Sequence, residues 1–211
     1  MRYVVLFFLI AGLMAYMVSH DHLSDYWRGQ SMPWDSWPTR GQLAPNDPVQ
    51  TLFPAGSVAT WSFHGDTITA LAGYSITARF LHRATYVGQL HGDIAPVDFA
   101  LGWGPMSDPS IYKQLDIGQS GRWYSWQYDS EPPIADDQIV SHSSNNHLVP
   151  ATDAVRDQLL ALTVGDVIQL TGYLIEVDGP DFRWRSSLSR TDTGDGACEL
   201  MWVEHAAKVG R

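Results

Sequence analysis

Two histidines lie close together in a polar segment of the chain. His142 and His147 flank the run Ser-Ser-Asn-Asn at positions 143–146. Two imidazoles and two amides within six residues can bind a metal or polarise a substrate. Their five-residue spacing fits neither one face of a helix nor an HExxH zinc site. The segment therefore indicates polar chemistry but matches no known metal motif.

A metal at these histidines would need a third ligand from elsewhere, and suitable carboxylates are Asp108, Asp192 and Glu199. The alternative is a hydrogen-bonded loop in which asparagine and histidine side chains cap backbone groups, as such side chains commonly do. We assign no metal ligands and no cofactor from the sequence. The candidate catalytic residues are His142, Asn145, His147 and Asp108.

Arginine is the dominant basic residue, with eleven arginines to two lysines, and several arginines adjoin tryptophan. Guanidinium groups stack on aromatic faces and form bidentate pairs with carboxylates. Such residues can line a groove for an anionic or sugar ligand. The candidate ligand-binding residues are Trp103, Arg122, Trp123, Arg183, Trp184, Arg185 and Arg190.

A structural role is the alternative for the arginines near the C-terminus. Paired charges on neighbouring strands fix the register of a sheet, and each exposed pair contributes less than about 1 kcal/mol. The pairs expected on adjacent strands join Arg183, Arg185 and Arg190 to Asp192, Asp195 and Glu199.

The chain has a single cysteine, Cys198. One cysteine rules out an intrachain disulfide, a cysteine-rich zinc site and a CxxC redox motif. Its sequence context, Gly-Ala-Cys-Glu-Leu-Met-Trp-Val over 196–203, is that of a buried strand. We therefore expect Cys198 to be a buried strand residue and not a nucleophile.

The 211 residues carry a net charge of −10, and the pI is near 5. Nucleic-acid binding depends on neutralising phosphates, so this charge argues against nucleic acid as a partner. It argues equally against an anionic membrane surface. The length allows one domain with appendages, large enough to bury a core.

The run Val4–Val18 contains no charge and no proline, and Arg2 precedes it. As a helix it would rise about 22 Å, against a hydrocarbon core of about 30 Å, a mismatch that local thinning can accommodate. Arg2 on one side and Asp21 and Asp25 on the other favour a cytoplasmic N-terminus. We expect a single-pass anchor in the bacterial inner membrane, with the body in the periplasm.

Two alternatives to an uncleaved anchor exist. A cleaved signal peptide needs small residues before its cleavage site, but the run ends with the bulky Tyr16 and Met17. The other alternative is a soluble protein with a buried N-terminal helix. The expected division of the chain is therefore an anchor over 1–19, a linker rich in proline and tryptophan over 20–57, and a β-rich globular domain over 58–211.

The globular part is expected to be mainly β with two or three short helices, an α+β class. Thr67–Thr85 and Arg122–Tyr128 alternate like strands. Asp108 followed by proline indicates the start of a helix that ends at Gly118. Thr152 or Asp153 is expected to cap a second helix.

The C-terminal third has the clearest pattern. Val167–Val177 changes phase after Gly172, as a β-bulge or a sharp bend requires. A turn at 178–181, a strand over Phe182–Arg190, a turn at 193–196 and a strand over Ala197–Glu204 complete a meander. Long, kinked strands with one helix resemble a small OB-type barrel, so the domain is expected to be antiparallel and partly barrel-like.

The chain also contains a short internal echo. Leu71-Ala-Gly73-Tyr74 and Leu170-Thr-Gly172-Tyr173 share the pattern Leu-x-Gly-Tyr. Two β-rich halves built around similar kinked strands would explain it, and so would chance.

Four segments together carry a resemblance to a family. They are Leu101-Gly-Trp-Gly-Pro-Met-Ser-Asp108, Ser120-Gly-Arg-Trp-Tyr124, Ser141-His-Ser-Ser-Asn-Asn-His147 and Ser186-Ser-Leu-Ser-Arg-Thr-Asp-Thr-Gly-Asp-Gly-Ala-Cys-Glu199. They resemble membrane-anchored proteins of Gram-negative bacteria whose activity is uncharacterised, over about residues 70–205. The resemblance implies an address in the cell envelope and no particular activity.

Two functions follow from the sequence as hypotheses. The first is a membrane-anchored periplasmic binding or assembly module of the cell envelope, with envelope proteins or glycans as partners and the membrane bound through the N-terminal helix. The second is a hydrolase, metal-dependent or histidine-based, with His142 and His147 in its site. A convergent, buried pair of these histidines beside a carboxylate would favour the hydrolase.

Overall fold

A computed structural model describes residues 44–54, 57–86, 88, 91–189 and 192–210. The expected N-terminal anchor and most of the expected linker lie outside these residues. None of the helices that the described residues form is long and apolar enough to span a membrane.

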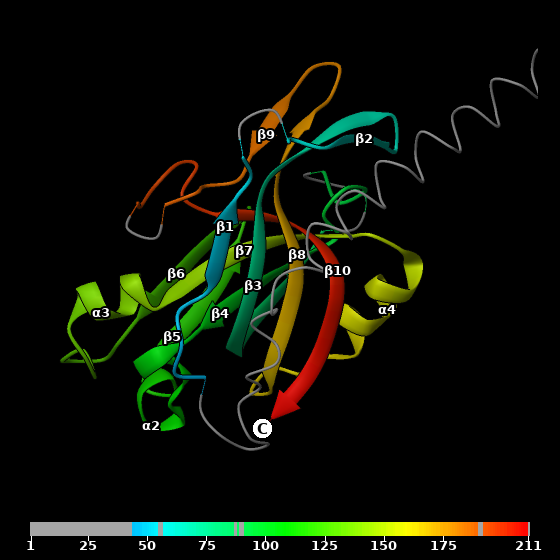
Figure 1. The fold of residues 1–211 in the computed structure, drawn as a ribbon. Coiled ribbons are helices and arrows are strands. Elements are labelled where there is room, and N and C mark those ends of the chain that lie inside the picture. Colours follow the sequence, from blue (N-terminus) through cyan, green and yellow to red (C-terminus); the bar gives the residue numbers. More distant parts are fainter. Residues whose placement is uncertain (1–43, 55–56, 87, 89–90, 190–191, 211) are drawn as a thin grey trace, which may run out of the picture.

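The described residues form a mainly β fold with three short α-helices and one 3-10 helix (Figure 1). The strands are β1 Val49–Leu52, β2 Thr60–Phe63, β3 Asp66–Thr85, β4 Val97–Gly102, β5 Asp116–Ser120, β6 Trp123–Gln127, β7 Ser143–Pro150, β8 Val167–Asp178, β9 Arg183–Arg185 and β10 Glu199–Gly210. The helices are η2 Gly104–Ser107, α2 Pro109–Tyr112, α3 Asp136–Ser141 and α4 Asp153–Ala161.

Five of the strands pair in a ring. The order is β3–β4–β7–β10–β8, and β8 pairs again with β3. All of these pairs are antiparallel except β7 and β10, which are parallel. The sheet is therefore mixed, and the short strands β1, β2 and β9 extend it from β3 and β8. Because β1 pairs with β3, the structured part begins within the range expected to be a linker.

The ring encloses an apolar interior made by alternate side chains of its strands. Phe80, Phe99, Leu148, Leu170 and Met201 are fully buried there. The helix α4 covers one side, through Leu159 and its neighbours. The hairpin of β5 and β6, with α2 and α3, lies on the other side (Figure 1).

The predicted kink at Gly172 is present, but the extra residues belong to the neighbouring strands. The registers of β3 and β10 shift between Ala70 and Ala72 and between Val203 and His205. Gly172 has a φ of +157°, and a Cβ there would lie 1.9 Å from the carbonyl oxygen of Trp202. The glycine therefore permits a backbone approach that no other residue allows.

Local signals placed several elements correctly. The predicted strand over Thr67–Thr85 is confirmed as β3. The hydroxyl of Thr152 accepts a hydrogen bond from the amide of Val155 at 3.2 Å, which confirms it as the cap of α4. Asp108 likewise caps α2 by accepting from the amide of Ser110 at 2.8 Å.

Other predicted elements were wrong. The helix after Asp108 ends at Tyr112, and Gly118 lies within β5. The strand predicted over Phe182–Arg190 is limited to the three residues of β9. The helix α3 and the strand β7 were not predicted, and β7 replaces the polar loop expected before α4.

Candidate ligand-binding pocket

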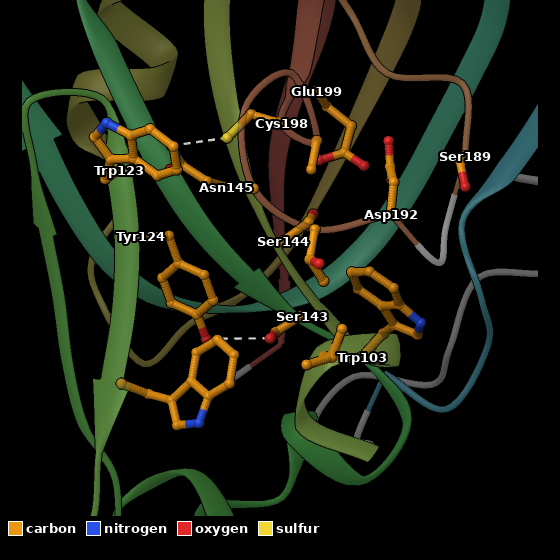
Figure 2. Close-up of a pocket in the computed structure, with 15 residues that line it drawn as sticks. Trp103, Trp123, Tyr124, Ser143, Ser144, Asn145, Ser189, Asp192, Cys198 and Glu199 are labelled. Atoms are coloured by element: carbon orange, nitrogen blue, oxygen red, sulfur yellow. Dashed lines mark hydrogen bonds between the residues drawn. The ribbon is translucent and has the colours of Figure 1, made fainter. Parts of the chain in front are cut away.

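A pocket of about 260 Å³ opens between the β5–β6 hairpin, the first half of β7 and the segment that leads into β10 (Figure 2). Aromatic side chains and polar side chains share its walls. The lining residues are Trp103, Trp123, Tyr124, Trp126, Val140, Ser143, Ser144, Asn145, Ser189, Asp192, Thr193, Gly194, Ala197, Cys198 and Glu199.

Strand β6 supplies most of the aromatic wall. Trp123 is 53% exposed. Tyr124 and Trp126 are less exposed, and their ring centroids lie 5.5 Å apart. The hydroxyl of Tyr124 donates to the Ser143 oxygen at 3.1 Å, and burial raises the pKa of Tyr124 to about 12. Tyr124 therefore stays neutral at physiological pH and holds the hairpin against β7.

A third tryptophan closes the pocket from another element. Trp103 follows β4 and is buried. Its indole N–H donates to Asp47 at 3.0 Å, which ties the start of the described chain to the pocket. Trp103 and Trp123 were both expected to bind a ligand, and the structure places both in the lining.

The amide of Asn145 is fully engaged within the protein. Its nitrogen donates to the carbonyl oxygen of Arg122 at 2.9 Å and lies 3.7 Å from the Cys198 sulfur. Its oxygen accepts from the side chain of Gln119. Asn145, one of the candidate catalytic residues, therefore joins three segments of the pocket wall and positions them.

Two carboxylates line the pocket on one side. In the view of Figure 2, Asp192 and Glu199 lie to the right and Trp123 lies to the left. Asp192 is exposed and accepts a hydrogen bond from the hydroxyl of Ser187 at 2.6 Å. Glu199 is only 2% exposed. None of the described residues that line the pocket is basic.

A buried charged cluster lies under the hairpin, formed by Asp98, Arg122 and His147. Asp98 and His147 face each other across β4 and β7. The Arg122 guanidinium binds one oxygen of Asp98, and the Nδ1 atom of His147 lies 2.9 Å from the other. The alignment of that second contact is not that of a hydrogen bond. Arg122 also donates to the carbonyl oxygen of Ala95 at 2.8 Å and covers the Tyr86 ring at 3.7 Å.

This cluster holds the turn of the hairpin. Gly121 and Arg122 join β5 to β6 with φ values of +58° and +72°, as a two-residue type I′ turn requires. Arginine rarely adopts a left-handed conformation. Its contacts with Asp98 and Tyr86 offset that cost and anchor the turn that leads into Trp123.

The two candidate histidines do not share a site. His142 ends α3, where its Nδ1 atom lies 2.9 Å from the carbonyl oxygen of Gln138. His147 lies five residues further along an extended chain, a rise of about 16 Å, and packs against Trp184 with ring centroids 4.8 Å apart. Within the described residues, no group of three His, Cys, Asp or Glu side chains is placed to hold a metal ion.

The arginines of β9 have partners other than those expected. Arg183 and Arg185 both bind the carboxylate of Glu176 on β8, because β9 pairs with β8 and not with β10. These two hydrogen bonds hold the pKa of Glu176 below its usual value. Neither arginine lines the pocket. Trp184 lies over His147 and Arg122, and Arg190 lies outside the described residues.

Cys198 differs from its expected place. It precedes β10, is partly exposed and lines the pocket. Burial of the thiol raises the pKa of Cys198 to about 11, so the thiolate is scarce at neutral pH.

Several lining residues were not recognised from the sequence as ligand-binding. Tyr124 and Trp126 were assigned only to a strand, and Ser143 and Ser144 only to a loop. Tyr124 and Trp126 alternate with Ser125, and this alternation indicated one aromatic face of a hairpin. Nothing local showed that this face would meet β7.

Comparisons with protein-family models, with curated proteins and with solved structures found no match to this chain.

Proposed function

We propose that this protein is a membrane-anchored periplasmic binding module of the bacterial cell envelope, and that the pocket holds its ligand. The observation that carries the proposal is the pocket itself. An exposed tryptophan, Trp123, and the carboxylates Asp192 and Glu199 line different sides of a cavity of about 260 Å³. Ligand sites combine such apolar walls with a few placed polar groups.

The lining comes from four separate parts of the chain: Trp103 follows β4, Trp123 begins β6, Asn145 lies in β7 and Glu199 begins β10. Segments that are far apart in the chain meet at one cavity. Convergence of this kind is expected at a binding site.

The strand order also supports a binding function. A ring of five strands with one helix between its third and fourth members resembles an OB-type barrel. Barrels of that type bind ligands on the face of their second and third strands and on nearby loops. Here those strands are β4 and β7, and the pocket adjoins β7.

The envelope location rests on the sequence. The apolar run Val4–Val18 and the charges around it favour an inner-membrane anchor with an exported body. Treating spheroplasts with protease tests this topology, and we expect the body to be digested from outside. Protection of the full-length chain until the membrane is lysed would contradict it.

The hydrolase hypothesis has less support. His147 does contact a carboxylate, Asp98, but its side chain is only 4% exposed and is covered by Trp184. A general base must reach the proton that it removes. The separation of His142 from His147 favours the binding function over a site built from both.

The binding function can be tested without knowing the ligand. The full-length protein is purified in detergent, incubated with a soluble extract of the envelope, and examined by native mass spectrometry. We expect a stoichiometric adduct that is lost in Trp123→Ala. Leu160→Ala, on the exposed side of α4, is the matched control and should keep the adduct. No adduct, or an equal adduct in both variants, would contradict the proposal.

A further inference from the structure

We infer that the pocket binds a neutral sugar unit, with one face of the sugar ring on Trp123 and its hydroxyl groups on Asp192. This inference rests on the proposed binding function and names the ligand class. Three features of the pocket carry it: an exposed aromatic face, an exposed carboxylate, and the placement of the two on different sides of the pocket.

The aromatic face is the first feature. Trp123 is more than half exposed, whereas the other aromatic residues that line the pocket are mostly or fully buried. The face of an indole carries negative charge and prefers weakly positive C–H groups. One face of a pyranose ring presents such C–H groups and is otherwise apolar. Stacking on Trp123 would therefore bury both surfaces.

The polar groups are the second feature. The hydroxyls of Tyr124 and Ser143 already donate within the protein, the former to Ser143 and the latter to the carbonyl oxygen of Ile139. The Asp192 carboxylate is exposed, and of its about four lone-pair sites one accepts from the hydroxyl of Ser187. A ligand that binds the remaining sites must donate hydrogen bonds. Sugar hydroxyls do so.

The placement of these groups is the third feature. Trp123 and the Asp192 carboxylate lie on different sides of the pocket (Figure 2). A ring with hydroxyls on its edge can contact both sides. The volume of about 260 Å³ lies just below the usual range of about 300–1,000 Å³ for small-molecule sites, which fits a single sugar unit.

The negative charge of the pocket should favour neutral sugars over acidic ones. The carboxylate of Asp192 would repel an anionic group brought next to it, and none of the described lining residues offers a compensating positive charge. A uronate or a phosphorylated sugar should therefore bind more weakly than its neutral counterpart.

Titration calorimetry on the full-length protein tests the inference. The detergent must have a polyoxyethylene headgroup, because maltoside headgroups are themselves neutral sugars. The probes are neutral disaccharides of glucose, galactose, mannose and N-acetylglucosamine, a uronate disaccharide, and tetramethylammonium. We expect one or more neutral disaccharides to bind, and the uronate to bind at least several-fold more weakly.

Variants locate the binding to the pocket. Trp123→Ala should weaken the best disaccharide about tenfold, and Trp123→Phe should restore most of the loss. Asp192→Asn should also weaken it about tenfold. Leu160→Ala should leave it unchanged. Equal affinity in Trp123→Ala and in the unmodified protein would overturn the inference.

The outcomes separate this inference from the proposed function. Equal or tighter binding of the uronate, or binding of tetramethylammonium alone, would overturn the sugar assignment. Failure of every sugar while the envelope adduct persists would also overturn it but leave the binding function standing. Failure of every sugar together with absence of the adduct would refute both.

Discussion

Replacing Asp98 with asparagine should strongly destabilise the protein. Asp98 is fully buried and is shared by Arg122 and His147, whose side chains are 12% and 4% exposed. Asparagine keeps the shape of the side chain but removes its charge. The Arg122 guanidinium would then remain in the interior without a counter-charge at that position.

The size of the effect follows from these contacts. Breaking a buried ion pair by neutralising one partner costs about 3–5 kcal/mol. Arg122 would keep its hydrogen bond to Ala95 and its contact with the Tyr86 ring, so we expect a value near the low end, about 3 kcal/mol. With a urea dependence of about 2 kcal/mol per molar, the unfolding midpoint should fall by about 1.5 M.

Urea unfolding followed by circular dichroism measures this shift. Asp153→Asn is the matched control, because Asp153 is 88% exposed and pairs with Arg156 on the surface of α4. Such a pair contributes at most about 1 kcal/mol. The double variant Asp98→Asn/Arg122→Met should recover part of the loss, because it also removes the buried cation. Equal midpoints for Asp98→Asn and Asp153→Asn would refute the reasoning.

Three further changes test other parts of the structure. Gly172→Ala should prevent folding into a soluble form, because its Cβ would meet the Trp202 carbonyl. Gly65→Ala, at a φ of +94° with open space around it, should cost only about 1 kcal/mol of stability. Soluble yield and urea midpoints compare the two variants. Glu176→Gln should be less stable than the unmodified protein at pH 7, and the difference should vanish at low pH. The lowered pKa of Glu176 means that its contribution is present above about pH 4.3, the unfolded value, and is lost as pH falls through the folded pKa; a constant difference from pH 7 to pH 2 would contradict this. Cys198 should react with iodoacetamide about 100-fold more slowly than a free thiol at pH 8 and at the normal rate in urea, because its pKa is raised to about 11.

The parts of the fold that local sequence predicted are those with strong local signals. The strand β3 alternates over a long stretch, and the cap at Thr152 stands directly before an apolar periodic segment. Gly172 interrupts such a pattern in β8 and correctly indicated an irregular register. In each case the signal and the structure that it describes lie within about a dozen residues.

The elements that were missed depend on distant partners. The start of β7 reads Ser-Ser-Asn-Asn-His and has no apolar alternation, so it resembles a loop. It is a strand because β4 on one side and β10 on the other satisfy its backbone. For the same reason Arg183 and Arg185 were assigned wrong partners: their side chains bind Glu176 once β9 pairs with β8.

The internal echo gains a physical meaning from the register of the ring. Gly73 faces Tyr173, and Tyr74 faces Gly172, across the antiparallel pair of β3 and β8. Each tyrosine is thus opposite a glycine, which leaves room for a large ring where two kinked strands approach. Complementary packing is sufficient to explain the repeated Leu-x-Gly-Tyr pattern, whether or not the halves share an origin.

The candidate residues Arg122 and His147 hold the pocket wall in place. His147 and Arg122 meet at Asp98, and the backbone of Arg122 accepts from Asn145 and leads directly into Trp123. A binding wall that is held in place before the ligand arrives loses less entropy on binding. Loss of the cluster should therefore weaken ligand binding even in the fraction of protein that stays folded.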